Sequence, residues 1–116
     1  MERMRHETKE QLILAMFDNK QHFLYDCVIS VGTVNASLVS PREIFLCALT
    51  HKAVHIILLH NHPSGDPTPS KEDIRITKMI EAGGVLLGIY LADHIVIGDK
   101  CFVSMREQGI LQERNE

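Results

Sequence analysis

The segment HNHPSGDPTPSKED, residues 60–73, lies between an apolar run and the start of a helix, and it decides how we interpret the fold. The run before it, AVHIILL at 53–59, has the length and composition of a buried strand. Side chains two residues apart on an extended chain point to the same side, so His60 and His62 can face one metal ion. The segment therefore predicts a metal site at the end of a strand.

The same segment also places a carboxylate close to the histidines. Residues 63–69 contain three prolines and one glycine, and Ser70 then begins an amphipathic helix with Asp73 in its first turn. Two imidazoles and one carboxylate leave the fourth tetrahedral position open for water, as in catalytic zinc sites. The spacing is also compatible with a plain helix cap formed by Ser70 and Asp73, with two ordinary polar histidines. Spacing alone leaves both interpretations open.

At these positions the chain resembles the JAB/MPN metalloprotease-like (JAMM) domains. Their signature is a glutamate, then His-x-His-Pro, then Ser-x-x-Asp, and the residues here at that spacing are His60, His62, Pro63, Ser70 and Asp73. Asn61 departs from the Ser or Thr that deubiquitinating members usually carry. The strings GTVNASLVSPRE (32–43), HNHPSGDPTPS (60–70) and DHIVIGD (93–99) are similar to the bacterial RadC group, which was named for DNA repair.

The resemblance assigns roles to individual residues. It implies zinc held by His60, His62 and Asp73, with Glu10 as the catalytic base and Ser70 as a hydrogen-bond donor to the oxyanion. The role of Glu10 comes from aligning residues 10–18 with the family's catalytic strand, because no spacing within this chain brings it to the histidines. We expect a zinc-dependent hydrolase that cleaves a peptide or isopeptide bond in a peptide or protein substrate.

A second glutamate competes for the role of base. Glu43 ends the sequence Ser40-Pro41-Arg42-Glu43, which is typical of an N-cap, an N1 proline and an N3 cap partner. Its carboxylate then has a structural task. We therefore prefer Glu10.

Other classes of function remain to be weighed. The alternative is a catalytically weak or inactive metal-binding interaction module in a DNA-repair or mobile-element context. The net charge of −3 lacks the basic excess that phosphate binding requires, so we do not expect this domain alone to bind nucleic acid. A zinc deaminase would carry a Pro-Cys-x-x-Cys element, which this sequence lacks.

Length and composition indicate one globular domain. We expect an N-terminal extension at 1–9, a RadC-like JAB/MPN domain at 10–112 and a C-terminal tail at 113–116. Hydrophobic residues make up 45% of the chain and charged residues 23%, without an apolar run of the ~20 residues that span a bilayer. We expect a soluble, cytoplasmic protein with no membrane partner.

The patterns predict an α/β fold with a mixed sheet flanked by helices, in the order ββαβαββ with extra short elements. Runs at 11–17 and 22–31 predict a hairpin, and helices are expected at 41–51 and at 70–82, the second ended by Gly83-Gly84. Strands follow at 85–91, 95–97 and 101–104, with His94 as a structural turn histidine. The resemblance implies the JAB/MPN, cytidine-deaminase-like fold.

The three cysteines predict no disulfide framework. Cys27, Cys47 and Cys101 are odd in number, widely separated and set in apolar surroundings. We interpret all three as buried thiols.

Overall fold

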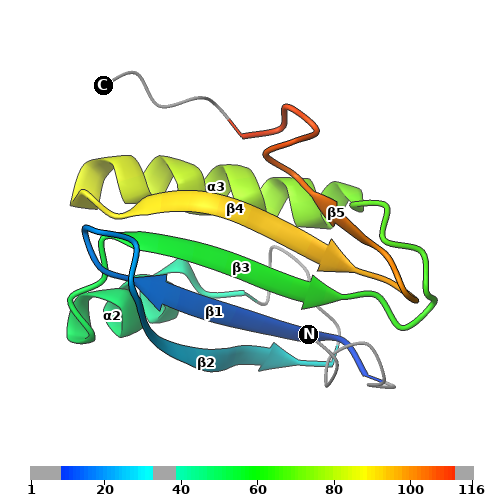
Figure 1. Ribbon diagram of the computed structural model, residues 1–116, viewed down its shortest axis with the longest axis horizontal. Coiled ribbons are helices and arrows are strands. Elements are labelled where there is room, and N and C mark those ends of the chain that lie inside the picture. Colours follow the sequence, from blue (N-terminus) through cyan, green and yellow to red (C-terminus); the bar gives the residue numbers. More distant parts are fainter. Residues whose placement is uncertain (1–8, 33–38, 112–116) are drawn as a thin grey trace.

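The computed structural model describes residues 9–32 and 39–111, which form one mixed sheet and two helices (Figure 1). The C-terminal tail expected from the sequence, and the N-terminal extension apart from residue 9, lie outside these residues. In chain order the elements are β1 (Gln11–Phe17), β2 (Phe23–Val31), α2 (Pro41–Thr50), β3 (His55–Asn61), α3 (Lys71–Leu87), β4 (Tyr90–Ile97) and β5 (Phe102–Ser104). This order confirms the predicted ββαβαββ arrangement.

The described strands form a five-stranded sheet in the order β2-β1-β3-β4-β5. β1 pairs antiparallel with both β2 and β3, which confirms the predicted hairpin, and β4 pairs antiparallel with β5. β3 and β4 run parallel, with α3 as the connection between them. The carboxyl end of β3 and the start of α3 are therefore neighbours, and His60, His62 and Asp73, the candidate metal ligands, all lie at this junction.

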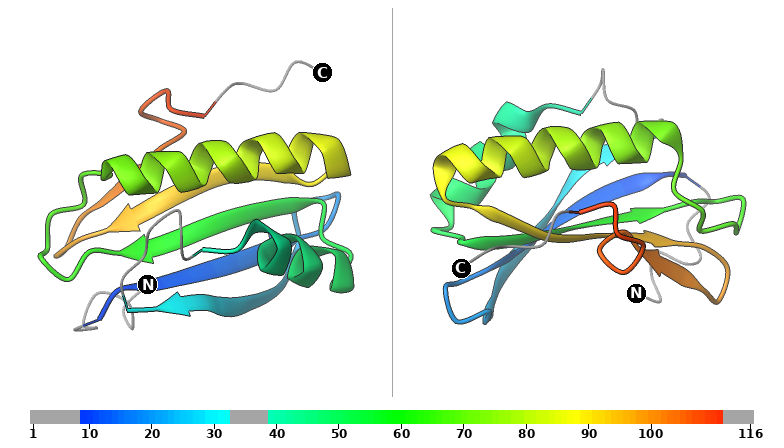
Figure 2. Two further views of the ribbon diagram at one scale, coloured as in Figure 1. Left: turned by 180° about the vertical axis from the view of Figure 1, so that it is seen from behind. Right: turned by 90° about the horizontal axis from the view of Figure 1, so that it is seen from above.

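Both helices pack on the same face of the sheet (Figure 2). Side chains from β1, β3, α2 and α3 form the main core there, among them Leu12, Leu14, Met16, Ile44, Phe45, Ile56, Leu58, Ile76 and Ile80. Alternation along a strand explains the set, because every second residue of β1 faces the helices. Among the described residues, no helix is both long and apolar enough to cross a membrane.

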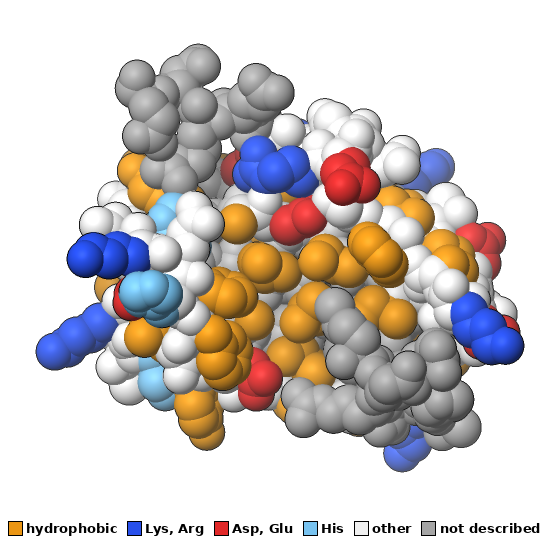
Figure 3. Space-filling view, in the orientation of Figure 1, with side chains coloured by type: hydrophobic (Ala, Val, Ile, Leu, Met, Phe, Trp, Pro, Cys, Tyr) orange, Lys and Arg blue, Asp and Glu red, His pale blue; other side chains and the backbone are white. Residues whose placement is uncertain are grey.

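The opposite face of the sheet carries a smaller apolar cluster of Ile13 and Ile97 with Leu59 and Ile95. Hydrophobic side chains gather across this face in the space-filling view (Figure 3). Val28 and Phe102 pair with Ile13 and Ile97, and remain 51% and 64% exposed. Within the described residues, the sheet is thus packed by helices on one side only.

α3 is longer than predicted. Gly83-Gly84 does not end the helix, which continues to Leu87 and stops at Gly88, a left-handed C-cap with φ 72°. A Cβ on Gly84 would lie 2.0 Å from the Ile89 carbonyl oxygen, and one on Gly83 would lie 2.7 Å from the Phe45 ring. The two glycines serve close packing inside the helix, so the strand expected to begin at residue 85 was a wrong prediction.

β4 is one strand where two were predicted. Its pairing with β3 passes from Leu91 to Asp93 between consecutive residues of β3, so Ala92 is the extra residue of a bulge. Asp93 does not form a turn: its Oδ1 accepts hydrogen bonds from the N–H groups of His94 and Arg106. His94 therefore lies within a strand, and its interpretation as a turn residue was wrong.

The prediction of three buried thiols also needs correction. Cys27 on β2 and Cys47 on α2 are half-buried and lie against the main core, whereas Cys101 is exposed. Cys101 stands in the turn before β5, outside the apolar alternation of the strands.

The Gly84 packing predicts a large effect for one added methyl group. Alanine gains about 1 kcal/mol over glycine in a helix interior, but contact with a backbone oxygen at 2.0 Å forces the main chain apart. We expect Gly84→Ala to lower the free energy of unfolding by a net ~1–2 kcal/mol in denaturant titration. The neighbouring Val85→Ala, at a side chain 69% exposed, should change it by less than about 0.5 kcal/mol. A stabilised Gly84→Ala protein would contradict the packing role.

Candidate metal centre

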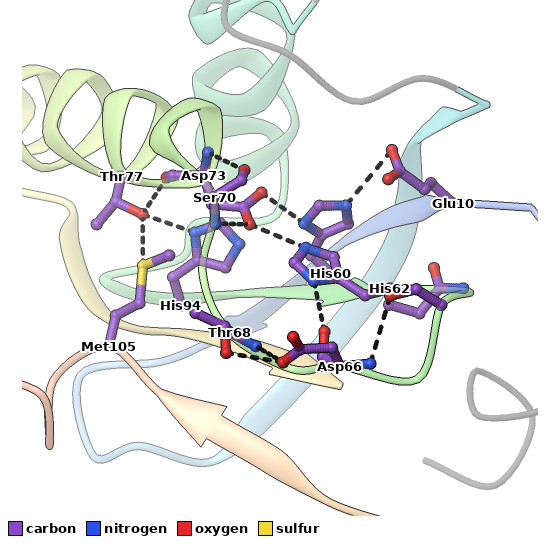
Figure 4. Close-up of polar contacts among 12 residues, drawn as sticks. Glu10, His60, His62, Asp66, Thr68, Ser70, Asp73, Thr77, His94 and Met105 are labelled. Atoms are coloured by element: carbon purple, nitrogen blue, oxygen red, sulfur yellow. Dashed lines mark hydrogen bonds and ion pairs between the residues drawn. The ribbon is translucent and has the colours of Figure 1, made fainter. Parts of the chain in front are cut away.

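The end of β3 and the first turn of α3 bring two imidazoles and a carboxylate together (Figure 4). His60 Nδ1 lies 2.8 Å from Asp73 Oδ1, and His62 Nε2 lies 2.9 Å from Asp73 Oδ2. One ligand atom from each of the three residues falls within 4.8 Å of the others. Donors around a tetrahedral zinc lie about 3.4 Å apart, so this group could hold one metal ion.

The hydrogen bonds of His62 favour a cation at this point. Its Nδ1 lies 2.9 Å from the Asp66 carbonyl oxygen, which can only accept, so Nδ1 carries a proton. Its Nε2 faces a carboxylate oxygen, Asp73 Oδ2, 2.9 Å away. Two facing lone pairs repel unless a proton or a metal ion lies between them. The residues present therefore fit a metal.

The buried atoms of His60 and Asp73 support the same conclusion. His60 and Asp73 are 1% and 0% exposed. Although His60 Nδ1 and Asp73 Oδ1 lie within ion-pair distance, neither atom has a hydrogen-bond partner among the described residues, and His60 Nε2 has none either. An unsatisfied buried polar group costs about 1–3 kcal/mol, and coordination of one His60 nitrogen and of Asp73 Oδ1 to a metal would remove that cost for those two atoms.

Asp73 is held as a carboxylate. Its Oδ2 accepts a 2.8 Å hydrogen bond from the Ser70 N–H, while Ser70 Oγ accepts one of 3.0 Å from the Asp73 N–H. Burial would raise the pKa of Asp73, but the His60 ring, the Ser70 N–H and the charges of both histidines outweigh it and hold this pKa well below its usual range. The helix cap and the candidate metal-ligand group share Asp73, so the two interpretations of this segment are compatible.

Ser70 keeps a proton to donate. Its Oγ accepts the Asp73 N–H, so the hydroxyl hydrogen is not needed for the cap. Ser70 stands beside the three ligand residues at the first turn of α3 (Figure 4).

The loop between β3 and α3 is fixed by hydrogen bonds to the β4–β5 turn. The His62 N–H donates to the Ile97 carbonyl, and the Asp99 N–H donates to the Gly65 carbonyl. A Cβ on Gly98 would lie 2.3 Å from the Gly65 oxygen, so glycine is required for this approach. This contact gives the DHIVIGD segment a structural reason to accompany the histidines.

The two glutamates lie in different environments. Glu10 Oε2 lies 3.8 Å from His60 Nε2, with the Glu10 side chain 33% exposed, so this carboxylate stands at the solvent side of the ligand group. Glu43 is exposed in the first turn of α2, where its N–H donates to Ser40 Oγ at 3.2 Å. The structure thus brings Glu10, and not the capping segment of Glu43, to within 4 Å of a candidate ligand.

His94, interpreted from the sequence as a structural residue rather than one that approaches the site, is a neighbour of the site. It is fully buried on β4, and its ring centroid lies 6.1 Å from that of His60. Thr77 Oγ1 donates to the Asp73 carbonyl at 2.8 Å and lies 2.7 Å from His94 Nδ1. Burial, and then the charge of His60, lowers the pKa of His94 to about 3. A neutral imidazole therefore packs behind the ligands; one unbroken strand at 90–97 would have predicted its inward direction.

A mixed five-stranded sheet with helices on one face and a His-His-Asp group at the β3–α3 junction defines a domain of the JAB/MPN type. The family model of the RadC-like JAB domain matches residues 1–110, and the chain belongs to this family.

Curated relatives are similar to this chain over most of its length. The chain is 47% identical over 110 residues to a UPF0758 protein of Methanosarcina acetivorans, and 50% identical over 111 residues to one of Desulfitobacterium hafniense. These alignments cover 95% and 96% of this chain but 48% and 49% of the relatives. The chain therefore spans about half the length of the curated relatives it matches.

Proposed function

We propose that the chain is a zinc-dependent hydrolase of the JAMM type, which cleaves a peptide or isopeptide bond of a peptide or protein substrate in the cytoplasm. The observation that carries the proposal is the gathering of Glu10, His60, His62 and Asp73 at one end of the β1–β3 pair. Three of these residues are donors that zinc prefers, and the fourth is a carboxylate without a role in that donor set.

His60, His62 and Asp73 would hold the metal, leaving a position for water or substrate. A zinc ion bound there lowers the pKa of a water molecule and polarises a carbonyl group. Glu10 would accept the proton of the attacking water at its carboxylate and deliver it to the leaving amine. Ser70 would donate its free hydroxyl hydrogen to the oxygen on which negative charge develops.

The proposal is tested by incubating zinc-loaded protein with libraries of peptides and of isopeptide-linked conjugates, and identifying products by mass spectrometry. We expect metal-dependent cleavage that a chelator abolishes and added zinc restores. Absence of cleavage from zinc-loaded protein across both libraries would instead favour a metal-binding module.

The charge balance makes a separate prediction about nucleic acid. With a net charge of −3, the chain has little counterion release to gain from a phosphate backbone. We expect no appreciable binding to duplex DNA at physiological salt in a fluorescence-polarisation titration. A sub-micromolar, salt-dependent affinity would show that the charge argument fails.

A further inference from the structure

Asn61 ends β3 and lies between the two histidines, but its side chain points the other way. It is 2% exposed. Its Oδ1 accepts a hydrogen bond from the Gln11 N–H at 2.5 Å, and its Nδ2 donates to the Lys9 carbonyl at 3.0 Å. One side-chain amide therefore binds the backbone on both sides of Glu10.

The regular ladder between β1 and β3 does not reach this point. Its last pair is Leu12 with His60, so the Asn61 amide continues the pairing beyond the end of the backbone hydrogen bonds. The Glu10 carbonyl accepts a further hydrogen bond from the Gly32 N–H at 2.8 Å. The ends of chains and strands are poorly ordered unless other contacts hold them in place. These three hydrogen bonds hold the backbone at Glu10 in place.

We propose that Asn61 is a positioning residue for Glu10: its amide sets where that carboxylate stands relative to His60. The inference rests on the proposed function, because it assumes that Glu10 acts as the base. The chemistry calls for an amide, since one end must accept an N–H and the other must donate to a carbonyl. An aspartate has no donor for Lys9, and an alanine has neither group.

Two measurements test this role: hydrogen exchange of the Gln11 amide, and kcat for a cleaved peptide. Both are made on zinc-loaded wild type, Asn61→Ala and Asn61→Asp. The control is Asn19→Ala in the exposed β1–β2 turn. In Asn61→Ala the Gln11 amide should exchange its hydrogen about tenfold faster, since it loses its acceptor. In both Asn61 variants, zinc content should stay at the wild-type level while kcat for a cleaved peptide falls by about tenfold or more with KM little changed. The control should match the wild type in all readouts.

Wild-type kcat despite faster exchange at Gln11 would overturn the inference, as would a loss of activity that follows a loss of zinc. Full activity of Glu10→Gln would instead contradict the proposed function, in which Glu10 is the base. Because the amide exchange is measured without a substrate, the two failures are distinguishable.

A second and independent observation concerns the thiols of Cys27 and Cys47. Their Sγ atoms lie 3.0 Å apart, one on β2 and the other on α2. A disulfide requires about 2.05 Å, so a shift of about 1 Å would bring the two sulfurs to bonding distance. The pair is half-buried rather than sealed in the core.

The surroundings distinguish the two sulfurs. Burial, followed by the hydrogen bond with Cys47, raises the pKa of the Cys27 thiol to about 12, so Cys27 stays protonated. His51 Nδ1 donates to the Cys47 carbonyl at 2.9 Å and lies 3.9 Å from Cys47 Sγ. Because Cys27 is held as a thiol, Cys47 is assigned as the sulfur that attacks first.

We infer that Cys27 and Cys47 form a redox-modification site that a hydroperoxide converts to a disulfide. The Cys47 thiolate attacks one peroxide oxygen, the O–O bond breaks, and hydroxide leaves to become water, which gives a sulfenic acid on Cys47. The Cys27 sulfur then attacks the Cys47 sulfur, the S–O bond breaks, and the hydroxyl leaves with the Cys27 proton as water. Two thiols are oxidised by two electrons, and one hydrogen peroxide is reduced to two waters.

The test treats the folded chain with hydrogen peroxide, alkylates the remaining thiols and maps peptides by mass spectrometry. Cys101→Ser removes the exposed thiol and serves as the matched background. In the Cys101→Ser protein we expect one cross-link between the peptides of Cys27 and Cys47, which dithiothreitol reverses. The cross-link should raise the unfolding temperature by roughly 10 °C. Adding Cys27→Ser should leave a sulfenic acid on Cys47 that dimedone traps. Cys27 and Cys47 remaining fully alkylatable after peroxide, or a sulfenic acid persisting while Cys27 is present, would overturn the inference.

Discussion

Replacing His62 with alanine is expected to reduce bound zinc from about one ion per chain to almost none, as measured by elemental analysis of purified protein. The reason is that His62 Nε2, 2.9 Å from Asp73 Oδ2, would be one of the three ligands of the proposed open site. Two ligands in the variant leave the ion mostly hydrated. Because metal binding stabilises the folded state, added zinc should raise the unfolding temperature of the wild type and not of His62→Ala.

His22→Ala is the matched control for this loss. His22 lies in the β1–β2 turn with its side chain 73% exposed, and its contact with Asp18 is local. The control should keep the wild-type zinc content. Stoichiometric zinc retained by His62→Ala would contradict the assignment of His62 as a ligand.

Glu10→Gln is expected to lower the rate of peptide cleavage by ~10²–10⁴-fold while the zinc content and the unfolding temperature barely change. Glutamine keeps the size of the side chain but cannot accept the proton of the attacking water. The 3.8 Å between Glu10 Oε2 and His60 Nε2 places the carboxylate beside the ligand group without making it a member of that group. The measurement is a comparison of kcat/KM and zinc content for the wild type and the variant.

The control is Glu43→Gln on α2. Since the cap at that helix uses the backbone N–H of Glu43 and the hydroxyl of Ser40, glutamine there should leave rate and stability nearly unchanged. The assignment of Glu10 as the base would be reversed if Glu43→Gln lost activity while Glu10→Gln kept it.

Local spacing predicted that His60, His62 and Asp73 lie close together, although by itself it did not decide between a metal site and a plain helix cap. His60 and His62 are two apart at the end of a strand, and Asp73 is the N3 residue of the next helix, so short-range geometry places all three. Glu10 is different, because the contact joins residues fifty positions apart along the chain. Only the family resemblance pointed to it.

The wrong predictions fell where tertiary contacts override local patterns. The sequence pattern predicted a helix stop at Gly83-Gly84, but the two glycines instead allow α3 to pack against Phe45 and Ile89. Asp93 read as a turn because periodicity does not reveal the bulge that keeps β4 continuous. The contacts of Asn61 with the backbone around Glu10 likewise depend on β1 lying beside β3, which no local pattern contains.

The most direct test of the account is a crystal structure of the zinc-loaded protein, with anomalous diffraction recorded at the zinc edge. We expect one strong peak bonded to His60, His62 and Asp73, a fourth position free of protein ligands, and the Glu10 carboxylate within hydrogen-bond reach of that position. A peak elsewhere, a fourth protein ligand closing the site, or Glu43 in the place of Glu10 would contradict it.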